Sequence, residues 1–330
     1  MLRILDARRD RFGLSRPFRI SRGVKTQAEV VTVTIGQGAT LGRGEGVPYP
    51  RYGETVDGAL AAIEAVRPLL EAGADRAAIA RAMLPGAARN AVDCALWDLE
   101  ARLGGGSVAA LAGRPEPAPL ASAITIGIDD PAAMAEVAAR AARAPLLKVK
   151  VDAAGAADRI RAVRAAAPAP RLIVDPNESW TLGDLERLEP LLVESHVDLL
   201  EQPLPAGEDE GLADRAWRVA VCADESLHTR ADLDALRGRY THVNIKLDKT
   251  GGLTEALLLA ETARARGFGL MLGCMVCSSL GVAPAMLVAA DAEFVDLDGP
   301  LWLAEDRPGG VVDRDGVLRP PAPGFWGAAA

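Results

Sequence analysis

Several residue types are scarce in this sequence, and each scarcity excludes a class of protein. Aromatic residues make up only 4% of the 330 residues, so the core must be largely aliphatic. The three histidines, His196, His228 and His242, are scattered and predict no histidine-based catalytic triad. The four cysteines occur without a secretion signal, which argues against a disulfide framework. Cys274 and Cys277 form a single pair with no suitably spaced histidine, so we expect a structural or pocket-lining role rather than zinc binding or redox chemistry.

Long apolar runs and basic runs are missing as well. The first ten residues, MLRILDARRD, lack the apolar region of a signal peptide, and no uninterrupted apolar stretch reaches membrane-spanning length. The net charge is −8, from 37 Lys+Arg against 45 Asp+Glu, which argues against nucleic-acid binding. We therefore expect a cytoplasmic protein that binds neither nucleic acid nor membrane. Its oligomeric state, homo-oligomers included, is left open.

The hydrophobic pattern changes near residue 115. Before this point, apolar alternation predicts a strand meander, followed by amphipathic helices and a Pro-rich linker. The expected strands are residues 2–7, 29–35 and 39–46, and the expected helices are residues 55–70, 76–83 and 87–103. A small α+β domain over residues 1–115 is therefore predicted.

From about residue 120, short apolar strands alternate with helical patterns. The eight expected strands are residues 123–127, 146–151, 171–175, 198–201, 219–223, 242–246, 269–272 and 293–296. This alternation favours a parallel sheet, and eight strands favour a closed barrel, although the pattern also suits an open doubly wound sheet. We predict a barrel over residues 116–300 and a C-terminal segment, residues 301–330, that packs back on the first domain.

Five of the predicted strands end in a charged side chain. They read LLKVK, LIVDPN, DLLEQP, VCADES and VNIKLD, and successive charges are 22 to 27 residues apart. That is the length of a βα unit, so Asp175, Glu201 and Asp224 should meet at one mouth of a barrel. Three buried carboxylates require a cation, and an all-oxygen ligand set favours Mg²⁺. Each carboxylate taken alone also suits a helix cap or a salt bridge.

The lysines flank these carboxylates. Lys148 and Lys150 are two residues apart in one strand and so share a face, predicted to be the barrel interior, whereas Lys246 should lie across the mouth. Neighbouring positive charge and partial burial are expected to lower a lysine pKa, which lets the amine act as a base. Two opposed bases beside a metal suit removal of a proton α to a carboxylate, followed by its return on the opposite face.

The motifs KVK, DPNESW, LEQPLP, ADES and NIKLDKTGGLTEA resemble the muconate-lactonizing subgroup of the enolase superfamily, most closely the L-Ala-D/L-Glu epimerases. PYPRYGE, ARNAVDCALWDL and DLDGP extend the resemblance over nearly the whole chain. It implies an α/β fold, a (β/α)7β TIM-like barrel with an N-terminal α+β capping domain. It further implies Mg²⁺ as the cofactor, with Asp175, Glu201 and Asp224 as its ligands.

The resemblance also implies roles for the other charged residues. Lys150 and Lys246 would be the acid/base pair, and Lys148 would stabilise charge on the substrate. Asp296 and Asp298 would hold a substrate ammonium group. Two carboxylates at i and i+2 face one way, so a cation between them would relieve their repulsion, although an Asp-Leu-Asp alone is more often a turn or a cap.

A substrate with an acidic side chain also needs a cation from the first domain. The early loop PFRISRGVK supplies three candidates, Arg19, Arg22 and Lys25, of which we favour Arg22, with Lys25 second; an exposed basic loop is the alternative. The resulting hypothesis is Mg²⁺-dependent epimerisation of the acidic dipeptides L-Ala-D-Glu and L-Ala-L-Glu, in the reuse of cell-wall peptides. The alternatives are epimerisation of another dipeptide, cycloisomerisation, o-succinylbenzoate synthesis, or a catalytically silent barrel.

Overall fold

The chain begins with a three-stranded antiparallel meander whose first hairpin is longer than predicted. The computed structural model describes residues 2–327. The meander consists of β1 (Arg3–Ile20), β2 (Gly23–Gln37) and β3 (Thr40–Gly46). Residues 8–20 were not expected in a strand because they are rich in arginine and contain Pro17. The register shifts between Gly13 and Phe18, which leaves Pro17, without an N–H, outside the paired ladder.

Helices cover one face of this meander. They are α1 (Val56–Ala65), α2 (Arg67–Glu71), α3 (Arg76–Ala82), α4 (Ala87–Leu103) and α5 (Val108–Leu111), with a short 3₁₀ turn (Pro50–Tyr52) before them. The single helix predicted over residues 55–70 is divided in two, because the chain turns at Val66 and Pro68 starts a new helix. The expected stop after α4 is present, since that helix ends at Leu103, before the three glycines.

Helix α4 packs directly on β3. The contact is made possible by Gly42, Gly44 and Gly46, which occupy one face of the strand. Cβ atoms at these three positions would lie 2.3, 2.1 and 2.1 Å from the backbone oxygens of Ala95, Ala91 and Ala87, respectively. Glycine is therefore required for this close approach of backbone to backbone.

The second domain is a closed parallel barrel rather than an open sheet. Its strands are β5 (Ile124–Ile126), β6 (Leu146–Lys150), β7 (Arg171–Asp175), β8 (Leu199–Glu201), β9 (Ala220–Ala223), β10 (His242–Ile245), β11 (Gly269–Gly273) and β12 (Phe294–Asp296). Neighbours in sequence are neighbours in the sheet, from β5 to β12. The Ala123 N–H donates to the Val295 carbonyl at 2.8 Å, which joins the two edges.

Helices surround the barrel. They are α6 (Pro131–Arg140), α7 (Ala156–Ala166), α8 (Leu182–Glu194), α9 (Leu233–Leu236), α10 (Leu247–Thr250), α11 (Leu253–Ala265), α12 (Ser279–Val282) and α13 (Met286–Ala289). None of the helices within residues 2–327 combines the length and the apolar character needed to cross a membrane.

The inward-facing side chains of the barrel form two layers. A lower apolar layer contains Ala123, Leu146, Ile173, Leu199, Cys222, Met271 and Phe294. Alternation along each strand then points the residue two positions later into the barrel as well. That residue is Lys148 after Leu146, Asp175 after Ile173, Glu201 after Leu199, Asp224 after Cys222 and Asp296 after Phe294. The apolar layer therefore seals the barrel beneath a layer of charge.

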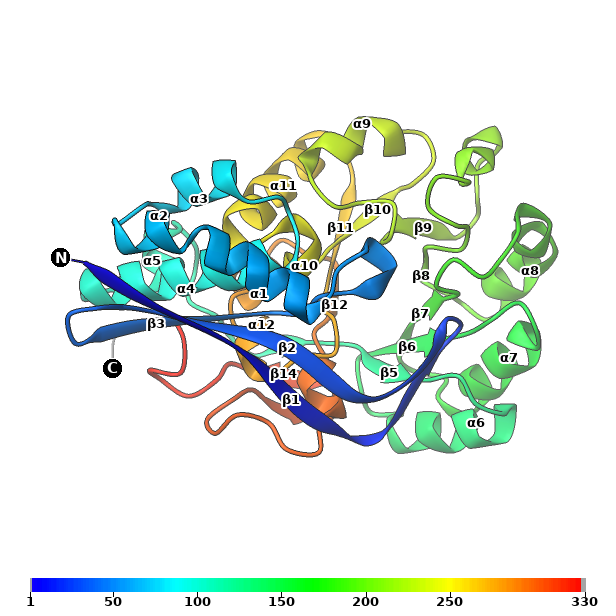
Figure 1. The fold of residues 1–330 in the computed structure, drawn as a ribbon. Coiled ribbons are helices and arrows are strands. Elements are labelled where there is room, and N and C mark those ends of the chain that lie inside the picture. Colours follow the sequence, from blue (N-terminus) through cyan, green and yellow to red (C-terminus); the bar gives the residue numbers. More distant parts are fainter. Residues whose placement is uncertain (1, 328–330) are drawn as a thin grey trace.

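The last part of the chain pairs with β4 (Leu120–Ala121) and contacts the N-terminal meander. Strands β13 (Val312–Arg314) and β14 (Val317–Arg319) pair with β4 in a small sheet of their own. Arg307 forms ion pairs with Glu45 and Asp10 of the meander, at 2.8 and 3.0 Å. The Trp326 indole N–H donates to the Arg43 carbonyl at 2.9 Å. Figure 1 shows the β1–β2 hairpin reaching from the N-terminal helices to the ends of β5–β7.

Candidate active site

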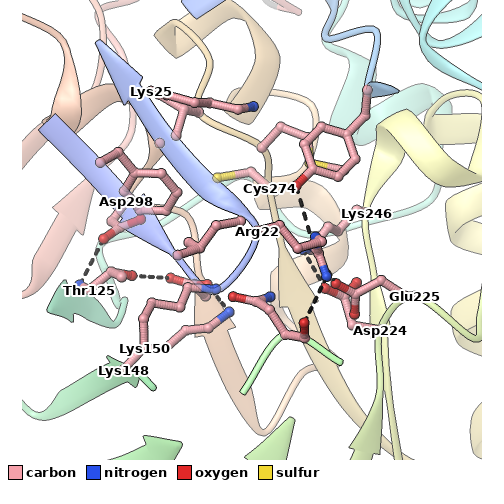
Figure 2. A pocket seen from close by; sticks show the side chains of 18 of the residues that line it. Arg22, Lys25, Thr125, Lys148, Lys150, Asp224, Glu225, Lys246, Cys274 and Asp298 are labelled. Carbon is pink, nitrogen blue, oxygen red and sulfur yellow. Dashed lines mark hydrogen bonds and ion pairs between the residues drawn. The ribbon is translucent and has the colours of Figure 1, made fainter. Parts of the chain in front are cut away.

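A pocket lies where the strand ends of the barrel meet the β1–β2 hairpin. Every residue predicted to act on the substrate lines it, namely Lys148, Lys150, Lys246, Asp296, Asp298, Arg22 and Lys25. Of the predicted metal ligands, Asp224 also lines the pocket, whereas Asp175 and Glu201 lie beneath its floor and are completely buried. Figure 2 shows Lys148 and Lys150 on one side of the pocket, and Lys246 with Asp224 on the other.

Lys148 is the centre of the buried charge. Its ammonium group lies 3.1 Å from Asp175, 2.7 Å from Glu201 and 2.8 Å from Asp296, and the side chain is 1% exposed. Burial favours the neutral amine, but the carboxylates outweigh it and hold the Lys148 pKa well above its ordinary range. Lys148 therefore stays charged. Lys150 reaches the same carboxylate of Asp175 at 2.5 Å.

On the opposite side, two lysines share one carboxylate. Lys246 lies 2.7 Å and Lys249 2.6 Å from the oxygens of Asp224. Burial again favours a neutral Lys246, but Asp224 dominates and raises the Lys246 pKa. With the carboxylates paired to lysines in this way, the pKa values of Lys148 and Lys246 are raised and not lowered as predicted, because each ammonium faces carboxylates directly.

Glu201 is the least satisfied of the three carboxylates. Its Oε1 accepts from the Asn244 amide at 2.9 Å, while Oε2 is buried and accepts no hydrogen bond, although Lys148 is near. Burial, reinforced by Asp175, raises the pKa of Glu201 to about 7. The Lys148 ammonium, 2.7 Å from Oε2, is the positive charge that balances this oxygen in the structure.

The carboxylates have the chemistry of a hard-cation site. Asp175, Glu201 and Asp224 follow three adjacent strands, and all three offer oxygen ligands. Within residues 2–327, no three His, Cys, Asp or Glu side chains converge tightly enough to form a ready-made metal cluster. The lysine ammonium groups lie among the carboxylates instead. Three buried carboxylates at adjacent strand ends would fit a hard metal ion in place of those ammonium groups.

The Asp296 and Asp298 pair forms a second, negative site at the end of β12. Asp298 Oδ2 accepts from the Thr125 N–H at 2.8 Å and from the Trp302 indole at 3.3 Å. Thr125 Oγ1 also lies 3.4 Å from Asp296 Oδ1, while Lys148 holds the other oxygen of Asp296. Burial, together with the charge of Asp296, raises the pKa of Asp298 to about 6.

The two candidate cations for the substrate side chain stand on a hairpin, not on a loop. Arg22 lies in the turn between β1 and β2, and Lys25 lies in β2. The Arg22 guanidinium is already paired with Glu178 and Glu225, at 2.9 and 2.7 Å. The Lys25 ammonium stands 4.6 Å above the centre of the Tyr49 ring.

Lys25 differs from Arg22 in its charge balance. No carboxylate within residues 2–327 forms an ion pair with Lys25, and burial, with Arg22 and Lys246 nearby, lowers its pKa to about 8. A bound anion would supply a negative charge beside the Lys25 ammonium and so raise its pKa. Arg22 thus has carboxylate partners on the barrel, whereas Lys25 has no ion-pair partner within residues 2–327.

Three further residues of the site were not identified from the sequence. Lys249 is one helical turn after Lys246, in the motif KLDKTGG, and anchors Asp224. Glu225 follows Asp224 directly and is buried, with one oxygen unsatisfied. Thr125, on β5, connects the two aspartates. Only Lys249 carried a signal, because it is a second lysine in the strand-end motif VNIKLDK.

The chain matches two family models that together cover most of its length. They are described as "Enolase C-terminal domain-like", over residues 132–325, and "Mandelate racemase / muconate lactonizing enzyme, N-terminal domain", over residues 5–113. The L-Ala-D/L-Glu epimerase of Escherichia coli is 49% identical over 295 residues, 89% of this chain and 92% of that protein. The N-acetyl-D-glutamate racemase of a Pseudoalteromonas species is 43% identical over 303 residues, 91% of this chain and 96% of that protein.

Solved structures agree with these matches. An enolase family member from Agrobacterium tumefaciens, with homology to dipeptide epimerases and with bound sodium and L-Ala-L-Glu, is 51% identical. It covers 98% of this chain and 100% of its own, with a TM-score of 0.96. A dipeptide epimerase from Enterococcus faecalis, complexed with Mg and L-Leu-L-Tyr, is 28% identical, covers 98% of both chains and gives a TM-score of 0.90. As its motifs predicted, this chain belongs to the mandelate racemase / muconate lactonizing enzyme family of the enolase superfamily.

Proposed function

We propose that this protein is a Mg²⁺-dependent dipeptide epimerase, an isomerase that interconverts L-Ala-D-Glu and L-Ala-L-Glu. One observation carries the proposal. Lys150 and Lys246 reach the pocket from β6 and from the end of β10, four strands apart in an eight-stranded barrel, so they approach a bound substrate from opposite sides. The E. coli relative, named L-Ala-D/L-Glu epimerase, supports this assignment.

The reaction requires proton transfer on both faces of the glutamyl Cα. Lys150 takes or gives the proton on one face and Lys246 on the other, so that removal and return invert the centre. Each lysine must first leave its carboxylate partner, Asp175 or Asp224, because only a neutral amine accepts a proton. Lys148 stays charged and stabilises the negative charge that develops on the substrate carboxylate.

The carboxylates released by the lysines become metal ligands in this scheme. Asp175, Glu201 and Asp224 would hold Mg²⁺, which supplies electrostatic stabilisation of the substrate carboxylate as its α-carbon loses the proton. The relatives with bound sodium or Mg beside a dipeptide support a hard cation here.

The two ends of the substrate have complementary partners. We assign the ammonium group of the dipeptide to Asp296 and Asp298, and the side-chain carboxylate to Lys25. An acidic dipeptide with a D-glutamyl residue suits the turnover of cell-wall peptides, and we propose that the protein acts in their reuse in the cytoplasm.

The proposal is tested by supplying each diastereomer separately to the Mg²⁺-loaded protein. Chromatography that resolves L-Ala-L-Glu from L-Ala-D-Glu should show both reactions converging on one mixture. N-acetylglutamate lacks the ammonium group and is the matched comparison, because one relative is an N-acetyl-D-glutamate racemase. Faster turnover of N-acetylglutamate than of the dipeptide would overturn the assignment of Asp296 and Asp298.

Replacing Lys25 by methionine is expected to raise KM for L-Ala-L-Glu about 30-fold, because a charge-assisted contact contributes roughly 2 kcal/mol. The KM for L-Ala-L-Gln, which has no side-chain charge, should change by less than about threefold. Steady-state kinetics with the two dipeptides measure this difference. Equal effects on both dipeptides would remove Lys25 from the carboxylate site.

Binding of the ammonium group should weaken in mild acid. Because the pKa of Asp298 is raised to about 6, the side chain is ionised at pH 8 and takes up a proton as the pH falls through 6. The site then loses one negative charge, so KM for the dipeptide should rise about tenfold between pH 7.5 and 5. Measuring KM against pH tests this, and Asp298→Asn, which cannot titrate, should give a flat profile in this range.

A further inference from the structure

Arg22 lines the pocket, but its guanidinium is paired with two carboxylates of the barrel loops. We propose that Arg22 is a positioning residue, an ion-pair latch that fastens the tip of the β1–β2 hairpin to the barrel and so holds Lys25 over the pocket. The proposal rests on the proposed function, because it explains how a cation on the capping domain is placed above a site built on the barrel.

The guanidinium of Arg22 bridges two loops of the barrel. Nη1 donates to the Asn177 carbonyl and to Glu178, both at 2.9 Å, and these residues follow β7. Nη2 donates to Glu225, after β9, at 2.7 Å. The neighbouring Ser21 hydroxyl adds a hydrogen bond to the same Asn177 carbonyl at 3.1 Å. The hairpin tip is therefore tied to two strand ends at once.

The β7 loop is shaped to receive this tip. Asn177 and Glu178 are consecutive residues with φ of +46° and +66°, a left-handed conformation that side chains other than glycine seldom adopt. The bend presents one carbonyl and one carboxylate to Arg22. Arg51, from the capping domain, donates two hydrogen bonds to the same Glu178 carboxylate, at 2.7 and 2.8 Å.

Charge balance assigns Arg22 to these partners and not to the substrate. The side chains of Glu178 and Glu225 are only 7% and 1% exposed, so both carboxylates need a buried cation. Arg22 and Arg51 together balance the charges of Glu178 and Glu225, which leaves no net positive charge for a substrate carboxylate. Lys25, in contrast, has no such partner within residues 2–327.

Tyr49 links the latch to Lys25. Its hydroxyl accepts from Arg22 Nη2 at 3.3 Å, and its ring face lies below the Lys25 ammonium at 4.6 Å. Figure 2 shows Arg22 in the middle of the pocket and Lys25 above it. Release of Arg22 would therefore free both the hairpin tip and the ring that supports Lys25.

The latch predicts an effect that does not depend on the substrate side chain. Arg22→Met should lower kcat/KM by about tenfold or more for L-Ala-L-Glu and for L-Ala-L-Gln alike, because both need the closed hairpin. The ratio of the two kcat/KM values should stay within about twofold of the wild-type ratio, whereas Lys25→Met should reduce it about 30-fold. Arg19→Met is the matched control on the same hairpin, since no ion pair of Arg19 is found within residues 2–327, and it should behave as wild type.

Hydrogen exchange tests the latch without any activity. In Arg22→Met, amides of residues 18–25 should exchange at least about tenfold faster than in wild type, while residues 30–35 stay protected. Arg22→Lys, which keeps the charge but cannot bridge two carboxylates, should be intermediate and serves if the methionine variant fails to fold. Glu178→Gln should add little to the effect of Arg22→Met.

Two results would overturn the latch. One is unchanged exchange at residues 18–25 in both Arg22 variants. The other is a loss in Arg22→Met confined to L-Ala-L-Glu, which would make Arg22 a ligand of the side-chain carboxylate. Absence of epimerisation in the wild type would refute the proposed function alone, and the exchange measurement would still decide on the latch.

Discussion

Replacing Lys150 or Lys246 by methionine is expected to lower kcat for epimerisation by about a thousandfold, because a positioned acid–base group contributes roughly 10²–10⁴ to the rate. Each variant removes the proton donor or acceptor on one face of the substrate. Neither variant can complete inversion, because the remaining lysine reaches only the other face.

The two variants should differ in proton exchange. In D₂O, each variant should still exchange the glutamyl Cα proton of the one diastereomer whose proton faces the remaining lysine, and the two variants should prefer opposite diastereomers. The double variant Lys150→Met/Lys246→Met is the control and should exchange neither. Full turnover by both single variants would contradict the two-base assignment.

Removal of divalent metal should lower kcat about as much as replacement of Lys150 or Lys246 does. Dialysis against EDTA is expected to reduce kcat by about a thousandfold, since metal stabilisation of a developing anion contributes several kcal/mol. Addition of Mg²⁺ should restore activity. It should also raise the unfolding temperature, because a ligand at a hundredfold excess over its Kd stabilises the folded state by about 2.7 kcal/mol.

Glu201→Gln connects this metal effect to the predicted ligands. The substitution keeps the shape of the side chain but removes the charge of this buried carboxylate, so Mg²⁺ should no longer raise the unfolding temperature. Glu208→Gln makes the same chemical change at an exposed carboxylate on the following loop and should retain the full Mg²⁺ response. An unchanged response in Glu201→Gln would show that the metal binds elsewhere or that the lysines alone neutralise the carboxylates.

The layered barrel interior was predictable because it follows from local rules. Five of the strands have an apolar residue and, two positions later, a charged one, as in Leu146 and Lys148 or Ile173 and Asp175. Parallel strands bring these positions to one level whatever the loops between them do. Strand position and the shared mouth could therefore be predicted without any knowledge of tertiary contacts.

The hairpin and its cations could not be predicted in the same way. The outer half of β1 is rich in arginine and interrupted by Pro17, and its strand conformation depends on pairing with β2. The choice between Arg22 and Lys25 depends on which of them meets Glu178 and Glu225, and these residues are about 150 to 200 positions away in the sequence. Ion pairing between distant segments leaves no periodic signal.

The raised pKa values of Lys148 and Lys246 could not be predicted from the sequence either. From the sequence, Lys148 and Lys246 were expected to lie near other cations, because the motifs hold several lysines. The structure places Lys148 against three carboxylates and Lys246 against one, so the sign of the effect depends on separations of 3 Å or so that sequence cannot supply.

The most direct test of the central claim is the proton NMR spectrum of L-Ala-L-Glu in D₂O with the Mg²⁺-loaded protein. The opposed lysines predict that the glutamyl Cα proton signal disappears while resonances of L-Ala-D-Glu grow, with the alanyl Cα signal unchanged. A glutamyl Cα signal that persists at full intensity, with no second diastereomer, would contradict the account.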